Sequence, residues 1–229
     1  MTNYDEIYDP DIGFDAYLSH ITAKRVRDIF KIENCNILDI GSGTGIIANY
    51  FYKTNNVYIV EQYPKYIEKL KNKFAPKKIY TQNFMDYDIP EIFDFIFIFN
   101  NLQEQEDIES FLLKVSENLS QQGSILITYP NASSIHRVIA KGIGIIKDIE
   151  LDQSKNSKKY GDKHLLTSEK VKYFISKANL KIKLEEGIFF KPFTNEELEK
   201  LDINELDFFN SLSKIYPQNC ALNFLEITK

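Results

Sequence analysis

The stretch Asn36-Ile37-Leu38-Asp39-Ile40-Gly41-Ser42-Gly43-Thr44-Gly45 decides the fold of this chain. Its apolar residues Ile37, Leu38 and Ile40 predict a short buried strand, and three glycines at alternate positions predict a tight turn after it. The apolar spacing of residues 46–51 predicts a helix that packs back onto a sheet. A strand, a glycine turn and a helix favour a nucleoside-type cofactor site, because backbone amides and a helix N-terminus then face the ligand.

Two acidic residues indicate which ligand this loop would take. Asp39 lies two residues before the first glycine, and Glu61 ends the next predicted strand, Val57–Val60. A carboxylate at the end of that strand can accept hydrogen bonds from both ribose hydroxyls. A fixed carboxylate at Asp39 would repel a pyrophosphate, but it suits a ligand that carries an ammonium and a sulfonium.

A dinucleotide cofactor is the alternative reading of the same loop. The dinucleotide fingerprint requires Gly-x-Gly-x-x-Gly, and Ile46 stands at the last glycine position. Ile46 and Asp39 therefore disfavour a nicotinamide-dependent oxidoreductase, which we keep as an alternative.

The strand, the loop and the acidic pair resemble those of the class I S-adenosylmethionine-dependent methyltransferases. The resemblance implies an α/β fold: a Rossmann-like, doubly wound, mostly parallel seven-stranded sheet with an antiparallel last strand, N-terminal helices and an acceptor-side insertion. The regular alternation of predicted strands and helices agrees with a mainly parallel sheet. The resemblance also implies S-adenosyl-L-methionine as the cofactor and S-adenosyl-L-homocysteine as the product.

The residues expected at the cofactor follow the ends of four predicted strands. After the third strand, Asn83 takes a place that is often acidic in the family, and its amide oxygen can accept the same hydrogen bond from adenine. After the buried strand Phe93–Phe99, the family often has Val-Leu-Glu-His; only Leu102 fits, so no catalytic role transfers to Gln103 or Glu104. The full cofactor set is Asp39, Gly41, Ser42, Gly43, Gly45, Glu61, Gln62, Asn83, Phe84, Met85, Asn100, Asn101 and Leu102.

We expect a single methyltransferase domain over residues 1–229. It comprises an N-terminal helical lid (1–34), a cofactor-binding core (35–130), an acceptor-side insertion (131–166) and the C-terminal half of the sheet (167–229). An insertion after the fifth predicted strand, Ser124–Tyr129, would lie at the carboxyl end of the sheet, where acceptors commonly bind in open α/β folds.

The insertion indicates a class of acceptor. The insertion resembles the corresponding segment of methyltransferases encoded with bacterial surface-polysaccharide genes, because it begins with Pro130-Asn131 and continues with Ser134-x-His136-Arg137. It differs from them at Gly161-Asp162-Lys163-His164, where Gly-His-Arg-Arg is expected. This resemblance implies a small polar acceptor, a hydroxyl of a sugar or nucleotide-activated sugar in capsule or surface-glycan biosynthesis. N-methylation remains open. No Asn/Asp-Pro-Pro-aromatic motif follows the fourth strand, which argues against DNA bases or glutamine as acceptors.

The candidate catalytic residues come from a short set. Of the three histidines in the chain, His136 is the first candidate for a base or acceptor-orienting group, His164 the second, and Glu104 is a third choice. Arg137 could bind a phosphate or carboxylate of the acceptor, and Tyr129 and Asn131 are further expected substrate contacts.

Composition limits the partners. A net charge of −5 disfavours nucleic acid as the main partner. The two cysteines are far apart, so neither a disulfide framework nor a zinc motif is indicated, and we expect no metal. With no signal-like start and no bilayer-length apolar run, we expect a cytoplasmic protein with no membrane contact. The oligomeric state stays open, as does a non-catalytic cofactor-binding subunit that acts with a partner chain.

Overall fold

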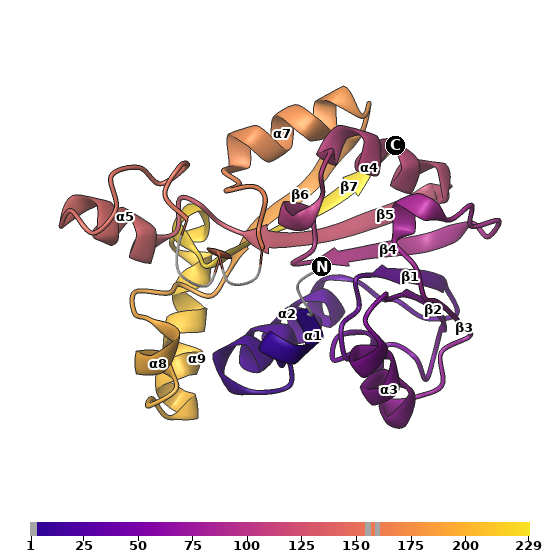
Figure 1. Ribbon diagram of the computed structural model, residues 1–229, viewed down its shortest axis with the longest axis horizontal. Coiled ribbons are helices and arrows are strands. Elements are labelled where there is room, and N and C mark those ends of the chain that lie inside the picture. The colour runs from indigo at the N-terminus through magenta and orange to yellow at the C-terminus, as the bar shows by residue number, and fades with distance from the viewer. Residues whose placement is uncertain (1–3, 154–156, 159–160) are drawn as a thin grey trace.

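The computed structural model describes residues 4–153, 157–158 and 161–229. The described residues form one seven-stranded sheet in the order β3-β2-β1-β4-β5-β7-β6. The first five strands pair in parallel, whereas β7 pairs antiparallel with both β5 and β6. In Figure 1 the arrows of β4 and β5 point to the left and the arrow of β7 points to the right. The predicted fold class is therefore confirmed, including the antiparallel last strand between two earlier ones.

The strands are β1 Asn36–Ile40, β2 Asn56–Val60, β3 Lys78–Tyr80, β4 Phe93–Phe99, β5 Leu119–Pro130, β6 Lys181–Ile188 and β7 Leu222–Thr228. The α-helices include α1 Tyr4–Ile7, α2 Gly13–Ile29, α3 Pro64–Lys73, α4 Ile108–Glu117, α5 Ile135–Gly142, α7 Ser168–Lys177, α8 Asn195–Leu198 and α9 Ile203–Ser211. Short 3₁₀ turns lie at Ala48–Tyr50, Phe84–Asp86, Leu102–Glu104, Leu212–Lys214 and Pro217–Asn219. Among the described helices, none is both long and apolar enough to cross a membrane.

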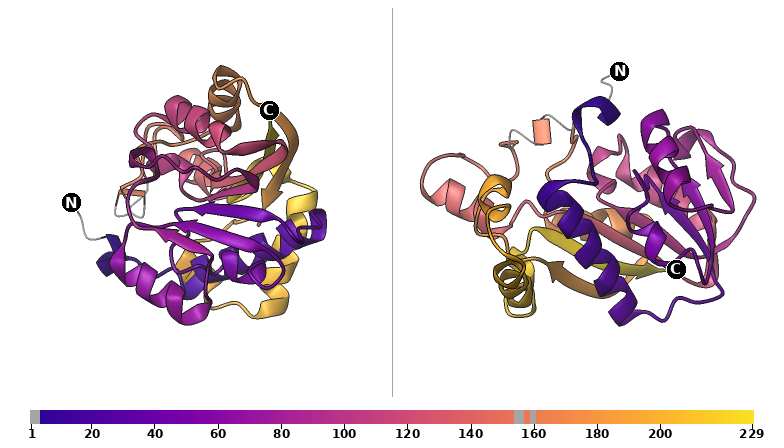
Figure 2. Two further views of the ribbon diagram at one scale, coloured as in Figure 1. Left: turned by 90° about the vertical axis from the view of Figure 1, so that its right-hand side faces the viewer. Right: turned by 90° about the horizontal axis from the view of Figure 1, so that it is seen from below.

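Strand β4 lies at the centre of the sheet because its sequence is apolar on both faces. Ile96 and Ile98 pack into the core that α4 and α7 cover, while Phe97 and Phe99 pack into the opposite core with α2. Figure 2 shows these helix layers on the two sides of the sheet. Each such fully buried side chain contributes roughly 1.5–3 kcal/mol to folding. The continuous apolar run thus fixes a strand that is covered by helices on both sides.

The predicted helix over residues 46–51 is wrong. The chain there forms only the 3₁₀ turn Ala48–Tyr50, flanked by hydrogen-bonded turns. Residues 46–55 must return along the length of the sheet before β2 begins, and an α-helix advances only about 1.5 Å per residue against about 2.0 Å for a 3₁₀-helix. Phe51 still packs on Phe97, with ring centroids 5.3 Å apart, so the apolar pattern reflects the core and not a helix.

The sequence Gln121-Gln122-Gly123 after the apolar pattern of residues 107–119 predicts a helix stop, and this prediction is also wrong. Helix α4 already ends at Glu117, and the three residues belong to β5. Asn118 makes the stop, because its Nδ2 donates to the carbonyls of Ile89 (2.7 Å) and Glu91 (3.0 Å) and ties the helix end to the loop before β4.

The sheet topology brings the carboxyl ends of six strands to one edge. Since β5 and β6 both run antiparallel to β7, β6 runs in the same direction as β5, and the carboxyl ends of β1, β2, β3, β4, β5 and β6 lie along the same edge. Helices α5, α8 and α9 lie beyond this edge, on the left of Figure 1. The segments that follow β5 and β6 are therefore placed beside the glycine loop that follows β1.

We predict that Gly187→Ala destabilises the fold by about 1–3 kcal/mol, because of overpacking. A Cβ at Gly187 in β6 would lie 2.3 Å from the carbonyl oxygen of Pro217 and 2.6 Å from Sγ of Cys220. Urea unfolding followed by circular dichroism measures the change. Gly142→Ala is the matched control, because nothing lies within 4 Å of the position of its Cβ. The urea concentration at which half of this variant is unfolded should equal that of wild type or be slightly higher. Equal midpoints for Gly187→Ala and wild type would contradict the packing around Gly187.

Candidate cofactor and acceptor site

The glycine loop after β1 is closed by a contact with the end of β4. Gly41 has a φ of +72°, a backbone conformation that favours glycine, and a Cβ there would lie 2.6 Å from Nδ2 of Asn101. The Gly43 amide donates a hydrogen bond of 2.7 Å to Oε2 of Glu61. The loop thus bends over the ends of β1 and β2 and is held there by a carboxylate from the neighbouring strand.

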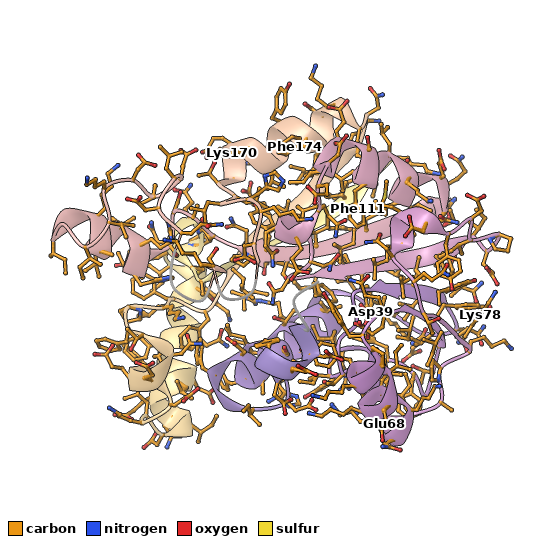
Figure 3. All side chains as sticks on the ribbon, in the orientation of Figure 1. Asp39, Glu68, Lys78, Phe111, Lys170 and Phe174 are labelled. Carbon is orange, nitrogen blue, oxygen red and sulfur yellow. The ribbon has the colours of Figure 1, made fainter. Side chains whose placement is uncertain are left out.

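Asp39 and Glu61 form the buried acidic pair that the sequence predicts at adjacent strand ends. Their exposed fractions are 3% and 4%. Asp39 accepts a 2.7 Å hydrogen bond from the Ser42 hydroxyl, and Glu61 Oε1 accepts one of 2.9 Å from the Tyr63 amide. Burial raises the pKa of Asp39 to about 7 and that of Glu61 to about 7, against the opposing effect of these hydrogen bonds. Figure 3 labels Asp39 near the middle of the molecule.

A cleft of about 1590 Å³ runs along this edge of the sheet. It is lined by most of the predicted cofactor set: Asp39, Gly41, Ser42, Gly43, Glu61, Gln62, Asn83, Phe84, Met85, Asn100 and Asn101. The predicted acceptor residues Asn131, His136 and Arg137 line the same cleft. The structure therefore brings residues from the ends of β1, β2, β3, β4 and β5 to one cavity.

Two members of the predicted cofactor set lie behind the cleft and not at its surface. A Cβ at Gly45 would lie 2.9 Å from the Phe74 ring, so this glycine lets the loop pack against the end of α3. Leu102 is fully buried in the core beneath α4. Neither residue lines the cleft, so a packing role accounts for both, and their predicted contact with the cofactor gains no support from the structure.

Tyr129 and His164 do not line the cleft either. Tyr129 is fully buried in the core that α7 covers, because the alternation of β5 turns it away from the acceptor side. The Nε2 of His164 lies 3.0 Å from the carbonyl oxygen of Gln105 and ties the loop after residue 161 to the end of the Leu102–Glu104 turn. The structure therefore gives no support to the expected substrate contact of Tyr129 or to the expected catalytic role of His164.

Two acceptor candidates line the cleft and also make structural hydrogen bonds. Arg137 donates through one guanidinium nitrogen to the carbonyls of Ile149 and Asp152, each at 2.7 Å, whereas its buried Nε has no hydrogen-bond partner. The Asn131 amide donates to the carbonyls of Gln218 (2.9 Å) and Cys220 (3.1 Å) and holds the end of β5 against the segment before β7. Their expected role in binding the acceptor stays a prediction.

Of the two histidines predicted to be catalytic, His136 lines the cleft. Burial, with Lys191 and Arg137 nearby, lowers its pKa to about 3, although its ring also bonds the Lys191 backbone. Its Nδ1 is buried and has no hydrogen-bond partner. The ring is therefore neutral at physiological pH.

Sequence reasoning missed three residues of the acceptor half, and gave Glu104 only a third place. Asp15 from α2, Asp162 from the insertion and Lys191 after β6 all line the cleft with Glu104. Burial raises the pKa of Glu104 to about 8, helped by the charges of Asp162 and Glu61. The one available signal for Lys191 was its position just past a predicted strand end, and nothing local indicated Asp15.

The segment before α2 contributes to the wall of the cleft through Asp5, Tyr8 and Pro10. It is fastened beside the glycine loop, because Asp11 accepts a 2.6 Å hydrogen bond from the Thr44 hydroxyl and pairs with Lys73. The predicted lid role of residues 1–34 stays a prediction, now with this contact as its basis.

Comparison with known proteins agrees with this geometry. Residues 14–186 match the model of a family described as a methyltransferase domain. No curated protein matches the sequence. A solved S-adenosylmethionine-dependent methyltransferase from Mesorhizobium loti is similar in fold, with a TM-score of 0.66 and 12% identity over 90% of this chain and 96% of that chain. One from Clostridium acetobutylicum has a TM-score of 0.60 and 13% identity over 98% and 97% of the two chains.

The plantazolicin methyltransferase, solved with a monoazolic desmethylPZN analog and S-adenosylhomocysteine, has a TM-score of 0.59 and 21% identity over 100% of this chain and 88% of that chain. Fold and site together define a class I S-adenosylmethionine-dependent methyltransferase. The chain belongs to the methyltransferase domain family. Membership of this family argues against the alternative of a nicotinamide-dependent oxidoreductase.

We predict that donor affinity rises with pH. The donor is a cation and favours the ionised forms of Asp39 and Glu61, which in the free protein are largely protonated below their pKa of about 7. If one carboxylate must ionise, S-adenosylmethionine binds about tenfold more weakly at about pH 6 than at about pH 8. Calorimetry across this range measures the change. S-adenosylhomocysteine, which lacks the sulfonium charge, should depend less on pH, and equal affinities for S-adenosylmethionine at both pH values would contradict the mechanism.

Proposed function

We propose that this methyltransferase transfers the methyl group of S-adenosylmethionine to a hydroxyl of a small polar acceptor, a sugar or nucleotide-activated sugar of surface-glycan biosynthesis. The observation that carries the donor assignment is the buried pair Asp39 and Glu61 around the glycine loop. The glycan acceptor rests on the resemblance of the Ser134-x-His136-Arg137 segment. The plantazolicin methyltransferase, which was solved with a monoazolic desmethylPZN analog, is consistent with an acceptor of limited size.

The residues present fit the donor. Each oxygen of Glu61 accepts one backbone hydrogen bond and keeps a lone pair for a ribose hydroxyl. Asn83 Oδ1 accepts from the Met85 amide at 2.9 Å, which fixes the side chain and leaves one lone pair for the adenine amino group. Phe84 and Met85 would cover the ring, and Asn100 and Asn101 would contact the methionine part. The sulfonium supplies an activated methyl group when the donor is bound.

On the acceptor side, the main task is to hold the attacking atom in line with the methyl group, an effect worth up to roughly 7–11 kcal/mol. A neutral imidazole with a pKa of about 3 is a weak base at neutral pH, so His136 is better suited to orient the acceptor than to remove its proton. The pKa of Glu104, about 8, suits proton removal better. We therefore assign orientation to His136 and keep Glu104 as the candidate base.

We predict that Glu61→Gln weakens the binding of S-adenosylmethionine and S-adenosylhomocysteine about 10- to 150-fold. The neutral amide loses a charge-assisted hydrogen bond to the ribose, worth about 1.5–3 kcal/mol. Calorimetry measures both affinities. Glu68→Gln on the exposed face of α3, labelled in Figure 3, is the matched control and should bind like wild type. Wild-type affinity in Glu61→Gln would remove the basis of the donor assignment.

We predict that His136→Ala lowers turnover by at least about tenfold and changes donor affinity by less than about threefold, a shift under 1 kcal/mol. Mass spectrometry of a nucleotide-sugar and metabolite library, searched for a methyl mass increment, provides the acceptor. The same screen tests the non-catalytic alternative, which would be favoured if the protein binds the donor but methylates no compound in the library.

His20→Gln is the control for His136→Ala, because the ring of His20 bonds the Tyr50 hydroxyl (2.9 Å) away from the cleft. Unchanged turnover in His136→Ala would refute its role.

A further inference from the structure

The acceptor half of the cleft contains a buried cation that the proposed function does not yet use. Lys191 follows β6 and lines the cleft, and burial lowers the pKa of its ammonium. Three elements converge on it. Its Nζ donates to Oδ1 of Asn195 in α8 and lies 5.1 Å from the centroid of the Phe14 ring in α2, and its backbone bonds the ring of His136 in α5.

Lys191 has a nearby carboxylate but no ion pair with it. Within the described residues, no carboxylate oxygen lies within the 4.0 Å ion-pair distance of its Nζ. Asn195 holds the charges apart, because its Oδ1 accepts from Lys191 while its Nδ2 donates to Oδ1 of Asp15 at 3.3 Å. Burial raises the pKa of Asp15, against the opposing effects of the Lys191 charge and the Asn195 hydrogen bond.

The other basic residues that the structure describes at the cleft are engaged or exposed. One guanidinium nitrogen of Arg137 donates to two backbone carbonyls, although its buried Nε has no partner. Lys163 pairs with Glu106 at 2.5 Å, and Lys158 is exposed. A partly buried ammonium without a direct ion pair is costly, and an anion that enters the cleft would lower that cost. Lys191 is therefore the cation of this cleft best placed to receive one.

We propose that Lys191 binds an anionic group, a carboxylate or a phosphate, of the methyl acceptor. The proposal rests on the proposed function and narrows the acceptor to a molecule that carries such a group close to the hydroxyl that is methylated. A uronic acid or a sugar phosphate meets this requirement, whereas a neutral sugar does not. Asn195 positions the ammonium, and His136, bonded to the backbone of the same lysine, lies beside the anion site.

The test uses the whole chain loaded with S-adenosylhomocysteine. Its unfolding temperature is measured against increasing acetate, succinate, glucuronate or phosphate, with chloride added to keep the ionic strength constant. We expect a saturable rise with at least one of these anions, and the carboxylate and phosphate arms distinguish the two groups. The anion concentration that gives half of this rise should be at least about tenfold higher in Lys191→Met than in wild type, and it should be unchanged in Lys191→Arg. Lys163→Met is the matched control from the same cleft and should behave like wild type.

Calorimetry with S-adenosylhomocysteine separates this proposal from the proposed function. All three variants should bind it as wild type does, which also shows that they fold. If wild type does not bind S-adenosylhomocysteine, the result contradicts the donor assignment of the proposed function and not the role of Lys191. An anion response that is absent from wild type, or equal in wild type and Lys191→Met, would overturn the role of Lys191. If Lys191→Met does not fold, Lys191→Gln takes its place in the same comparison.

Discussion

The structure depends on two carboxylates that are buried at the ends of adjacent strands. Asp39 and Glu61 lie out of water, and an ionised carboxylate is stable there only when donors or a cation compensate for lost hydration. The Ser42 hydroxyl and the amides of Gly43 and Tyr63 supply part of this compensation. The cost that remains is reflected in the raised pKa of both carboxyls, and a cationic ligand would lower it. The same hydrogen bonds that fold the glycine loop therefore leave an acidic site suited to a cationic donor.

The position of β7 divides the cleft into two halves. Because β7 is inserted antiparallel between β5 and β6, the chain after β6 returns to the edge where the glycine loop lies. The cofactor half is formed by the ends of β1 to β4, and the acceptor half by the segments after β5 and β6. The first half contains the buried carboxyls Asp39 and Glu61, whereas the second contains the partly buried Lys191 beside His136, together with Asp15 and Asp162. A positive donor and an acceptor with an anionic group would thus be sorted to opposite ends of one cavity.

The N-terminal segment connects the two halves. Asp11 bonds Thr44 of the glycine loop and pairs with Lys73 of α3, while Asp15, a few residues later, faces the acceptor half. The segment is held by ion pairs at the surface, which are weak individually and sensitive to salt. Such contacts are compatible with a segment that opens and closes over the cofactor, whereas the glycine loop beneath it is fixed by buried hydrogen bonds.

The sequence by itself determined the parts of the protein that depend on neighbours along the chain. The strand–loop–strand unit from Asn36 to Glu61 and the buried strand Phe93–Phe99 follow from local apolar patterns and glycine chemistry, and the cofactor side of the cleft was predictable for that reason. The tertiary structure alone decided the acceptor side. Whether Arg137 faces a ligand or a backbone carbonyl, and whether Lys191 meets His136, depends on crossovers and strand register that join segments far apart in the chain. Local patterns contain no information about such contacts, because they report which residues are buried but not which residues they are buried against.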